Sequence, residues 1–414
     1  MSKVIALTTS ILICASVLLA NAREPVDKKT ASDLPAVKEL SNPFVFEDGS
    51  PVKRKDDWTR RRAELKRLFE DYEYGHYPPK PEKMTVTRGE LQVDEAAKVA
   101  RRELTINLEH AGKTLALHVR LILPNQGKGP FPVVVMAGFG RPMGAGPGNP
   151  PAPAPAPAKK KQGPPPNRLG IFAERGYAVA EFNFQEAALD NKDRAKTVGV
   201  YQLFGENIDC GALLAWAWGI HRVIDAIETD PMIDAKKIVV TGHSRYGKTA
   251  LLAGAFDERI ALTVPSHSGC GGTAPYRFIY GKSEQLHNIV GAFPYWFRPD
   301  FNQFVGKVDR LPVDQHLLRA LVAPRALLST EGTQDAWTNP EGSQLTYLAA
   351  RKVYEFLGVA DRQSIRFRPV GHIPSNEDLL DFADHVFFDK PLGEDFGKLA
   401  YPEEKSAFDW SVPK

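Results

Sequence analysis

The chain has 414 residues, of which 43% are hydrophobic and 25% are charged, so it has ample apolar material for a globular core. This composition excludes a disordered chain, a collagen and a membrane protein with many spans. The 53 basic and 50 acidic side chains give a formal net charge of +3, too close to balance for a dedicated nucleic-acid binder. We expect one large domain in a monomer, with no nucleic-acid partner and no stable membrane association.

The first 22 residues have the features of a secretory signal. Lys3 gives a positive start, residues 4–19 are mostly apolar, and residues 20–22 place small side chains at a cleavage site. We predict a secreted or periplasmic protein whose mature chain begins near Arg23. A membrane anchor and a lipoprotein attached at Cys14 are the alternatives, although the apolar run is short for a membrane span.

Two cysteines, Cys210 and Cys270, remain in the predicted mature chain. An exported protein can join them in a disulfide. A chain of this size does not need such a bridge, however, and buried free thiols are common. The sequence leaves both outcomes open.

The residue pattern of the N-terminal third predicts an extended lead-in, a helix and two strands at the edge of a sheet. Residues 23–56 are polar and interrupted by proline, which is typical of an extended lead-in, and we place a single catalytic domain at residues 57–414. Apolar residues recur at helical spacing from residue 57 to residue 72, and Gly75 ends this helix. Alternating apolar residues from Val99 to Leu123 then predict two antiparallel strands at the edge of a mixed sheet.

Further along the chain the pattern changes to short, nearly continuous apolar runs, which indicate parallel strands covered on both faces. Helical segments at residues 213–227, 248–255 and 345–357 lie between these runs. The alternation predicts a doubly wound, mostly parallel α/β sheet with helices on both faces. The predicted parallel strands are Val133–Met136, Tyr177–Ala180, Ile238–Val240, Ile260–Val264 and Ala326–Leu328.

Residues 141–166 interrupt this alternation with ten prolines and three consecutive lysines. We expect a solvated loop insertion here, and contact with an acidic polymer is the alternative. The glycine-rich residues 144–148 follow a strand, as in a dinucleotide site. A proline tract replaces the helix whose N-terminus would bind the phosphates, so we reject that interpretation.

Residues 238–255 carry the main chemical signal. A buried strand leads into Gly242-His243-Ser244-Arg245-Tyr246-Gly247 and then into a helix, as in a nucleophile elbow. Small residues must flank the serine of an elbow so that the two backbones can approach. Gly242 stands two residues before Ser244, but Gly247 stands three after it, one residue later than in Gly-x-Ser-x-Gly. The strand and helix around the motif still favour Ser244 as a nucleophile.

An acid and a histidine should follow the elbow in that order, on loops after later strands. Asp335 follows a predicted strand and is the predicted acid, with Glu331 and Glu341 as alternatives. His372 follows the last apolar run and is the predicted base. It would take the proton of Ser244 and return it to the leaving alcohol, while Asp335 would hold its tautomer.

The remaining titratable residues fit other roles better. We expect His221 to be structural, His243 to point away from the site and to serve in packing, and Asp257 to be a surface charge. His267 is the exception, because it follows the strand after the elbow helix and can line the site. No His-x-x-x-His or Cys-x-x-Cys spacing is present, so we predict no metal and no cofactor.

Residues 242–248 read Gly-His-Ser-Arg-Tyr-Gly-Lys, which resembles the Gly-Cys/His-Ser-Arg-x-Gly-Lys signature of the glucuronoyl esterases, carbohydrate esterase family fifteen. That signature carries the same displaced glycine. The resemblance implies an α/β-hydrolase that cleaves the ester between (4-O-methyl-)glucuronic acid groups of xylan and lignin alcohols. Other matching segments, at residues 268–272, 293–297, 311–314, 323–325 and 335–337, extend it over roughly residues 57–390.

The resemblance also implies roles for individual residues. Arg245 resembles the family's oxyanion stabiliser, and a guanidinium beside the nucleophile suits developing negative charge. Lys248 resembles the residue that contacts hydroxyls of the uronate, and Gln285 and Trp337 resemble its other sugar contacts. We keep His267 as a further candidate for substrate binding.

One position departs from the fungal pattern. Fungal members carry a catalytic glutamate in Glu-Ser-Gly-x-Gly-Gly, and this chain has His267 in its place. The acid must come from elsewhere, as in many bacterial members, which agrees with Asp335. The leading hypothesis is a secreted serine esterase for uronate esters of glucuronoxylan, acting through an acyl-enzyme on Ser244. One alternative is a hydrolase with the same fold and triad that acts on acetylated xylan or on a peptide. The other is a non-catalytic carbohydrate-binding protein on the same fold.

Overall fold

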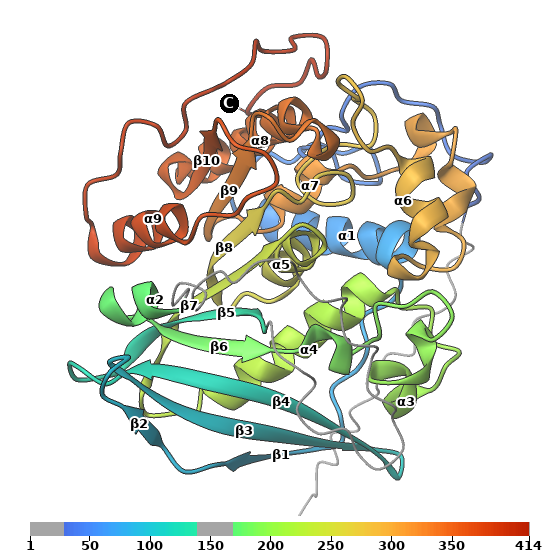
Figure 1. The fold of residues 1–414 in the computed structure, drawn as a ribbon. Coiled ribbons are helices and arrows are strands. Elements are labelled where there is room, and N and C mark those ends of the chain that lie inside the picture. Colours follow the sequence, from blue (N-terminus) through green and yellow to red (C-terminus); the bar gives the residue numbers. More distant parts are fainter. Residues whose placement is uncertain (1–28, 139–168, 414) are drawn as a thin grey trace, which may run out of the picture.

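A computed structural model describes residues 29–138 and 169–413 (Figure 1). The predicted signal at residues 1–22 and the Pro/Lys-rich segment at residues 141–166 lie outside the described residues. The described residues form one ten-stranded mixed sheet. Its strands, in spatial order, are β1 (Lys83–Arg88), β3 (Val99–His110), β4 (Lys113–Pro124), β6 (Ala178–Phe182), β5 (Phe131–Ala137), β7 (Ile233–His243), β8 (Ile260–Ser266), β9 (Ala326–Gly332) and β10 (Gln363–Arg368), with β2 (Gln92–Asp94) paired to β3.

The strand pairing follows the hydrophobic pattern of the sequence. Strands β1, β3, β4 and β6 pair antiparallel, whereas β6, β5, β7, β8, β9 and β10 pair parallel. The parallel strands β5 and β9 are buried at nearly every position, because helices cover both of their faces. The predicted mixed α/β sheet with an antiparallel N-terminal edge is therefore confirmed. The sequence did not reveal β1 and β2, whose side chains are mostly exposed.

Helices pack on both faces of the sheet (Figure 1). Two successive residues of β7 show the two sides, since Val240 belongs to the core that includes α4 and α5, and Val239 to the core that includes α2 and α9. Both residues are fully buried. The α-helices of the described residues are α1 (Asp57–Phe69), α2 (Gly170–Glu174), α3 (Val200–Phe204), α4 (Ala212–Ile227), α5 (Arg245–Phe256), α6 (Leu286–Ala292), α7 (Gln315–Ala320), α8 (Pro340–Leu357) and α9 (Asn376–Phe388).

The first predicted helix ends where the sequence indicated. Helix α1 continues into a short π-helix, Glu70–Tyr74, and stops at Gly75, whose φ is 82°. A Cβ at Gly75 would lie 2.2 Å from the carbonyl oxygen of Asp209, so only glycine fits this close approach. The lead-in before α1 is irregular, as expected, but it also packs against the domain, because Phe44 and Phe46 are buried in its main core.

Two further observations concern the cysteines and membrane-spanning helices. Cys210 and Cys270 are both buried free thiols, so the structure has no disulfide between them. None of the helices within residues 29–138 and 169–413 combines the length and apolar character that a membrane span requires.

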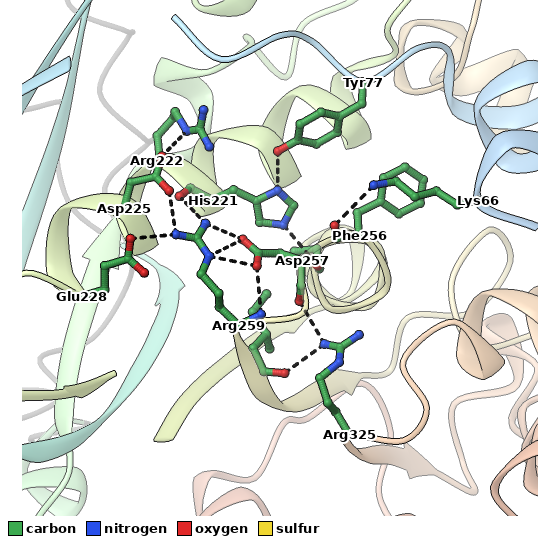
Figure 2. Close-up of polar contacts among 12 residues, drawn as sticks. Lys66, Tyr77, His221, Arg222, Asp225, Glu228, Phe256, Asp257, Arg259 and Arg325 are labelled. Carbon is green, nitrogen blue, oxygen red and sulfur yellow. Dashed lines mark hydrogen bonds and ion pairs between the residues drawn. The ribbon is translucent and has the colours of Figure 1, made fainter. Parts of the chain in front are cut away.

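A buried polar network joins α4 to the end of α5 (Figure 2). His221 Nε2 donates to the carbonyl oxygen of Ala253 at 3.0 Å, and its Nδ1 accepts from the hydroxyl of Tyr77. Asp257 binds Arg259 at 2.6 Å, and its side chain is only 10% exposed. The structural role predicted for His221 is confirmed. The surface position predicted for Asp257 is wrong, because its side chain is largely covered and pairs with the partly exposed guanidinium of Arg259.

We expect His221 to make stability depend on pH. Burial lowers its pKa from 6.5 to about 4, so between these values the unfolded chain binds a proton that the native chain excludes. This share of the free energy of unfolding is therefore fully present above pH 6.5 and is lost on acidification to about pH 4, by on the order of 3 kcal/mol. Denaturant unfolding across this range should show a smaller pH slope for His221→Gln. The exposed His287, changed to Gln, is the control, and equal slopes in all three proteins would contradict the expectation.

Candidate active site

Ser244 occupies a strained turn between β7 and α5. Its φ of 59° and ψ of −124° belong to a region that residues with a side chain rarely adopt. Its N–H donates to the carbonyl oxygen of Ser266 at 2.9 Å. A Cβ at Gly242 would lie 2.1 Å from the carbonyl oxygen of Tyr246, and one at Gly247 would lie 2.8 Å from that of Ser266. The predicted elbow, including its displaced glycine, is confirmed as a local structure.

The predicted acid and base lie together after β9 and β10. Asp335 Oδ2 is 2.6 Å from His372 Nδ1, and both residues face the same cleft as Ser244. The side chain of Asp335 is 8% exposed and that of His372 is 42% exposed. Glu331, one alternative acid, is buried instead against Thr273 Oγ1 at 2.8 Å. Of the sequence candidates, Asp335 is therefore the carboxylate that the fold brings to His372.

A second imidazole binds the same carboxylate oxygen. His267 Nδ1 lies 3.0 Å from Asp335 Oδ2, and the His267 side chain is 2% exposed. His267 lines the same cleft, as expected, and its ring also binds the acid. Its contact with the sugar stays a prediction. Burial alone would raise the pKa of Asp335, but the bonds to His267 and His372 outweigh it and hold that pKa well below its ordinary value.

His243 does not point away from the site, contrary to the sequence prediction. Its ring centroid lies 4.2 Å from that of His372 and 5.4 Å from that of His267. Burial lowers the pKa of His243 to about 4, with smaller contributions from the two neighbouring imidazoles. His243 is therefore neutral at pH 7, and its ring packs beside the predicted base.

Within the described residues, His267, Asp335 and His372 form a set of donors that metals use. Their ligand atoms lie within 4.8 Å of one another. Sequence spacing did not indicate this set, because the three residues come from three separate loops. Both Nδ1 atoms donate to Asp335 Oδ2, so a metal would have to replace these two hydrogen bonds.

The cleft around Ser244 has a volume of about 390 Å³, and we call it the Ser244 cleft. Trp337 lies at its rim with 53% of its surface exposed. Gln285 is exposed at the N-cap of α6, where its backbone N–H donates to Asn288 Oδ1 at 2.9 Å, and it is not among the lining residues. Its predicted sugar contact stays a prediction. The lining residues are Ser244, Arg245, Lys248, His267, Ser268, Glu284, Phe293, Trp296, Asp335, Trp337, Thr338 and His372.

Arg245 is held by a carboxylate and two aromatic rings. Its Nη1 lies 2.5 Å from Asp190 Oδ2, and its guanidinium carbon lies 5.1 and 5.0 Å from the ring centroids of Phe293 and Trp296. Asp190 Oδ1 also accepts from the Tyr295 hydroxyl at 2.6 Å and from the Trp296 indole at 3.0 Å. These contacts fix the guanidinium beside Ser244 before any substrate binds.

Lys248 extends from α5 into the interior of the cleft. Its Nζ donates to the carbonyl oxygen of Ser268 and lies 3.7 Å from Glu284 Oε2. Burial lowers the pKa of Lys248, and the Glu284 charge opposes this effect. Burial raises the pKa of Glu284, opposed by Lys248. Each partner therefore favours the charged form of the other.

Comparison with known proteins decides the family. The family model described as "Glucuronyl esterase, fungi" matches residues 106–358. A 4-O-methyl-glucuronoyl methylesterase of Hypocrea jecorina is 36% identical over 395 residues, covering 90% of this chain and 75% of that protein. The chain belongs to the glucuronoyl esterase family. The resemblance found in the sequence motif is thus confirmed.

Solved glucuronoyl esterases share the fold. The enzyme of carbohydrate esterase family 15 from Caldicellulosiruptor kristjansonii matches with a TM-score of 0.76 at 34% identity, over 92% of this chain and 98% of that one. A glucuronoyl esterase mutant from Sporotrichum thermophile, in complex with methyl 4-O-methyl-β-D-glucopyranuronate, matches with a TM-score of 0.69 at 28% identity, over 87% and 90% of the two chains. The α/β-hydrolase fold expected from the motif is confirmed.

Sequence reasoning missed two carboxylates of this glucuronoyl esterase site. Asp190 lies in a loop without a recognisable motif, more than fifty positions before Arg245. Glu284 is adjacent to Gln285, the residue that we selected. The signal for such residues is that a cation in a cleft needs an acidic partner. A single sequence does not show which carboxylate reaches Arg245 or Lys248.

We expect Asp335→Asn to lower kcat on a small uronate ester by about 10³- to 10⁴-fold, since the amide can neither fix the tautomer of His372 nor stabilise its charged form. Steady-state kinetics with a circular-dichroism check of folding would measure this. Glu341→Gln, at the other alternative acid, should keep wild-type kcat. A large loss in Glu341→Gln with none in Asp335→Asn would overturn the assignment.

Proposed function

We propose that this protein hydrolyses esters of glucuronic acid or 4-O-methyl-glucuronic acid, with glucuronoxylan joined to lignin alcohols as the polymeric substrate. The single observation that carries this proposal is the Asp335–His372 pair in a cleft with the strained Ser244 and two basic residues. An uncharged ester carbonyl needs a nucleophile, a base and a stabilised oxyanion, and this set supplies each. The names of the relatives supply the uronate as the acyl group.

In the acylation step, Ser244 Oγ attacks the ester carbonyl while His372 removes its proton. Asp335 binds Nδ1 of His372, which leaves Nε2 to exchange the proton. The negative charge that develops on the carbonyl oxygen is stabilised by Arg245 and by the backbone N–H that follows Ser244. His372 then protonates the alcohol oxygen, the ester C–O bond breaks, and the uronoyl group stays bound to Ser244.

In the deacylation step, water repeats the sequence from the vacated alcohol position. His372 removes a proton from water, the hydroxide attacks the uronoyl carbonyl, and the bond to Ser244 breaks. The proton returns to Ser244 Oγ, and the free uronic acid leaves. Asp335 balances the charge on His372 in both steps.

The sugar-binding roles extend this proposal. Lys248 has three donors in the interior of the cleft, and the two that do not bind the Ser268 carbonyl oxygen can serve Glu284 and the uronate hydroxyls. The exposed Trp337 offers an apolar face to the pyranose ring. Gln285 lies at the N-cap of α6 and outside the residues that line the cleft, and we assign it the third sugar contact from its resemblance to the family pattern. Polymeric xylan is outside cells, so the proposal includes export directed by residues 1–22.

Hydrolysis of benzyl glucuronate, compared with an acetate ester and a peptide anilide, tests this function. We expect the mature protein to prefer the uronate ester and Ser244→Ala to lose at least 10³-fold of the activity, because no other residue replaces the nucleophile. Ser32→Ala changes an exposed serine and should retain full activity. Activity confined to the acetate or the anilide would move the protein to another esterase or peptidase class. No activity on any of the three would favour a binding role.

Arg245 should act mainly on the transition state. Arg245→Lys keeps a charge but loses the fork that Asp190 and the aromatic rings hold, so we expect kcat on benzyl glucuronate to fall by about 10²-fold. Arg245→Met should lower kcat by about 10³-fold, with a smaller change in KM. Lys282→Met removes an exposed cation outside the cleft and serves as the control. Wild-type kcat in both Arg245 variants would refute the role.

A further inference from the structure

Each basic side chain of the Ser244 cleft has its own partly buried acidic partner. Arg245 binds Asp190, whose side chain is 10% exposed, and Lys248 faces Glu284, whose side chain is 12% exposed. Asp335 adds a third carboxylate. Among its Arg, Lys, Asp and Glu side chains, the site thus holds two cations and three anions. No net positive charge is left to attract an anion.

Ester hydrolysis changes the charge of the ligand in this cleft. The bound ester is uncharged at its carbonyl, whereas the product is a carboxylate that is ionised at neutral pH. The new charge appears next to Ser244, in a cleft small enough that its lining charges lie within about one Debye length of it, ~10 Å at 0.1 M salt. Whether the product is retained therefore depends on how completely Arg245 and Lys248 are neutralised.

We propose that Glu284 is a specificity-determining residue that makes the site favour the neutral ester over the anionic uronate product. This inference rests on the proposed function. Glu284 cancels the charge of Lys248, which would otherwise attract the product carboxylate, and so speeds product release. Asp190 does the same for Arg245 but also binds Tyr295 and Trp296. Glu284 is the better residue to test, because its side-chain contact in the cleft is with Lys248.

Lys248 should stay in place when its partner is changed. Its Nζ also donates to the carbonyl oxygen of Ser268, and the side chain is buried along α5. Glu284 itself is fixed through its backbone, whose N–H donates to the carbonyl oxygen of Trp337 at 2.9 Å. Glu284→Gln therefore removes one negative charge with little change of shape.

Binding of two isosteric ligands, glucuronate and its neutral amide glucuronamide, tests the inference. Calorimetric titration should show that Glu284→Gln raises the affinity for glucuronate relative to glucuronamide by about tenfold, and that this gain shrinks at 1 M salt. Glu341→Gln removes a carboxylate outside the cleft and should leave the ratio unchanged. Product inhibition of benzyl glucuronate hydrolysis should strengthen in parallel in Glu284→Gln.

Two results would overturn the inference. An unchanged affinity ratio in Glu284→Gln would show that Glu284 does not discriminate by charge. Equal changes for glucuronate and glucuronamide would show that it only positions Lys248. Binding is measured apart from turnover, so the two failures can be told apart. If the wild-type protein hydrolyses benzyl glucuronate but Glu284→Gln leaves the affinity ratio unchanged, only this inference is refuted. If the wild-type protein hydrolyses no uronate ester, the proposed function is refuted as well.

Discussion

The active site depends on keeping one buried carboxylate charged. Asp335 is almost fully covered, and a charge there is tolerated only because His267 and His372 both donate to the same oxygen. The fungal motif has a glutamate at the position of His267. A glutamate there would place a second anion against Asp335, and the two carboxylates would repel each other. Histidine at residue 267 and the acid at residue 335 therefore depend on each other, since a hydrogen-bond donor to Asp335 stands where the fungal motif has an acid.

The sheet brings these three side chains together. Strands β8, β9 and β10 are parallel neighbours, so His267, Asp335 and His372 all follow the same edge. Backbone bonds fix the loops, with the His267 N–H donating to Thr330 at 2.9 Å. Gly332 provides the necessary space, because a Cβ there would lie 2.8 Å from His267 Cε1 and 2.4 Å from the Val370 carbonyl oxygen. A strand end without a side chain is thus part of the site.

The sequence predicted what depends on local pattern and chain order. Continuous apolar runs indicated the parallel strands, the flanked Ser244 indicated the elbow, and the rule of acid before histidine selected the pair that the structure joins. The sequence did not predict contacts between distant segments of the chain. Periodicity shows which residues are buried, but not which carboxylate meets which cation, as at Asp190 and Glu284. Gln285 shows the same limit, because the sequence does not show that it lies at the N-cap of α6, outside the residues that line the cleft.

Pairing also explains how a cleft with several charges can be partly buried. An isolated Arg245 or Lys248 would carry a large desolvation cost, which Asp190 and Glu284 offset. The two pairs still differ in use. The guanidinium of Arg245 has donors beyond the one bound to Asp190, so it can meet an oxyanion that exists only in the transition state. Lys248 is shared between Ser268 and Glu284 from the outset, which suits contact with hydroxyls that are present in substrate and product alike.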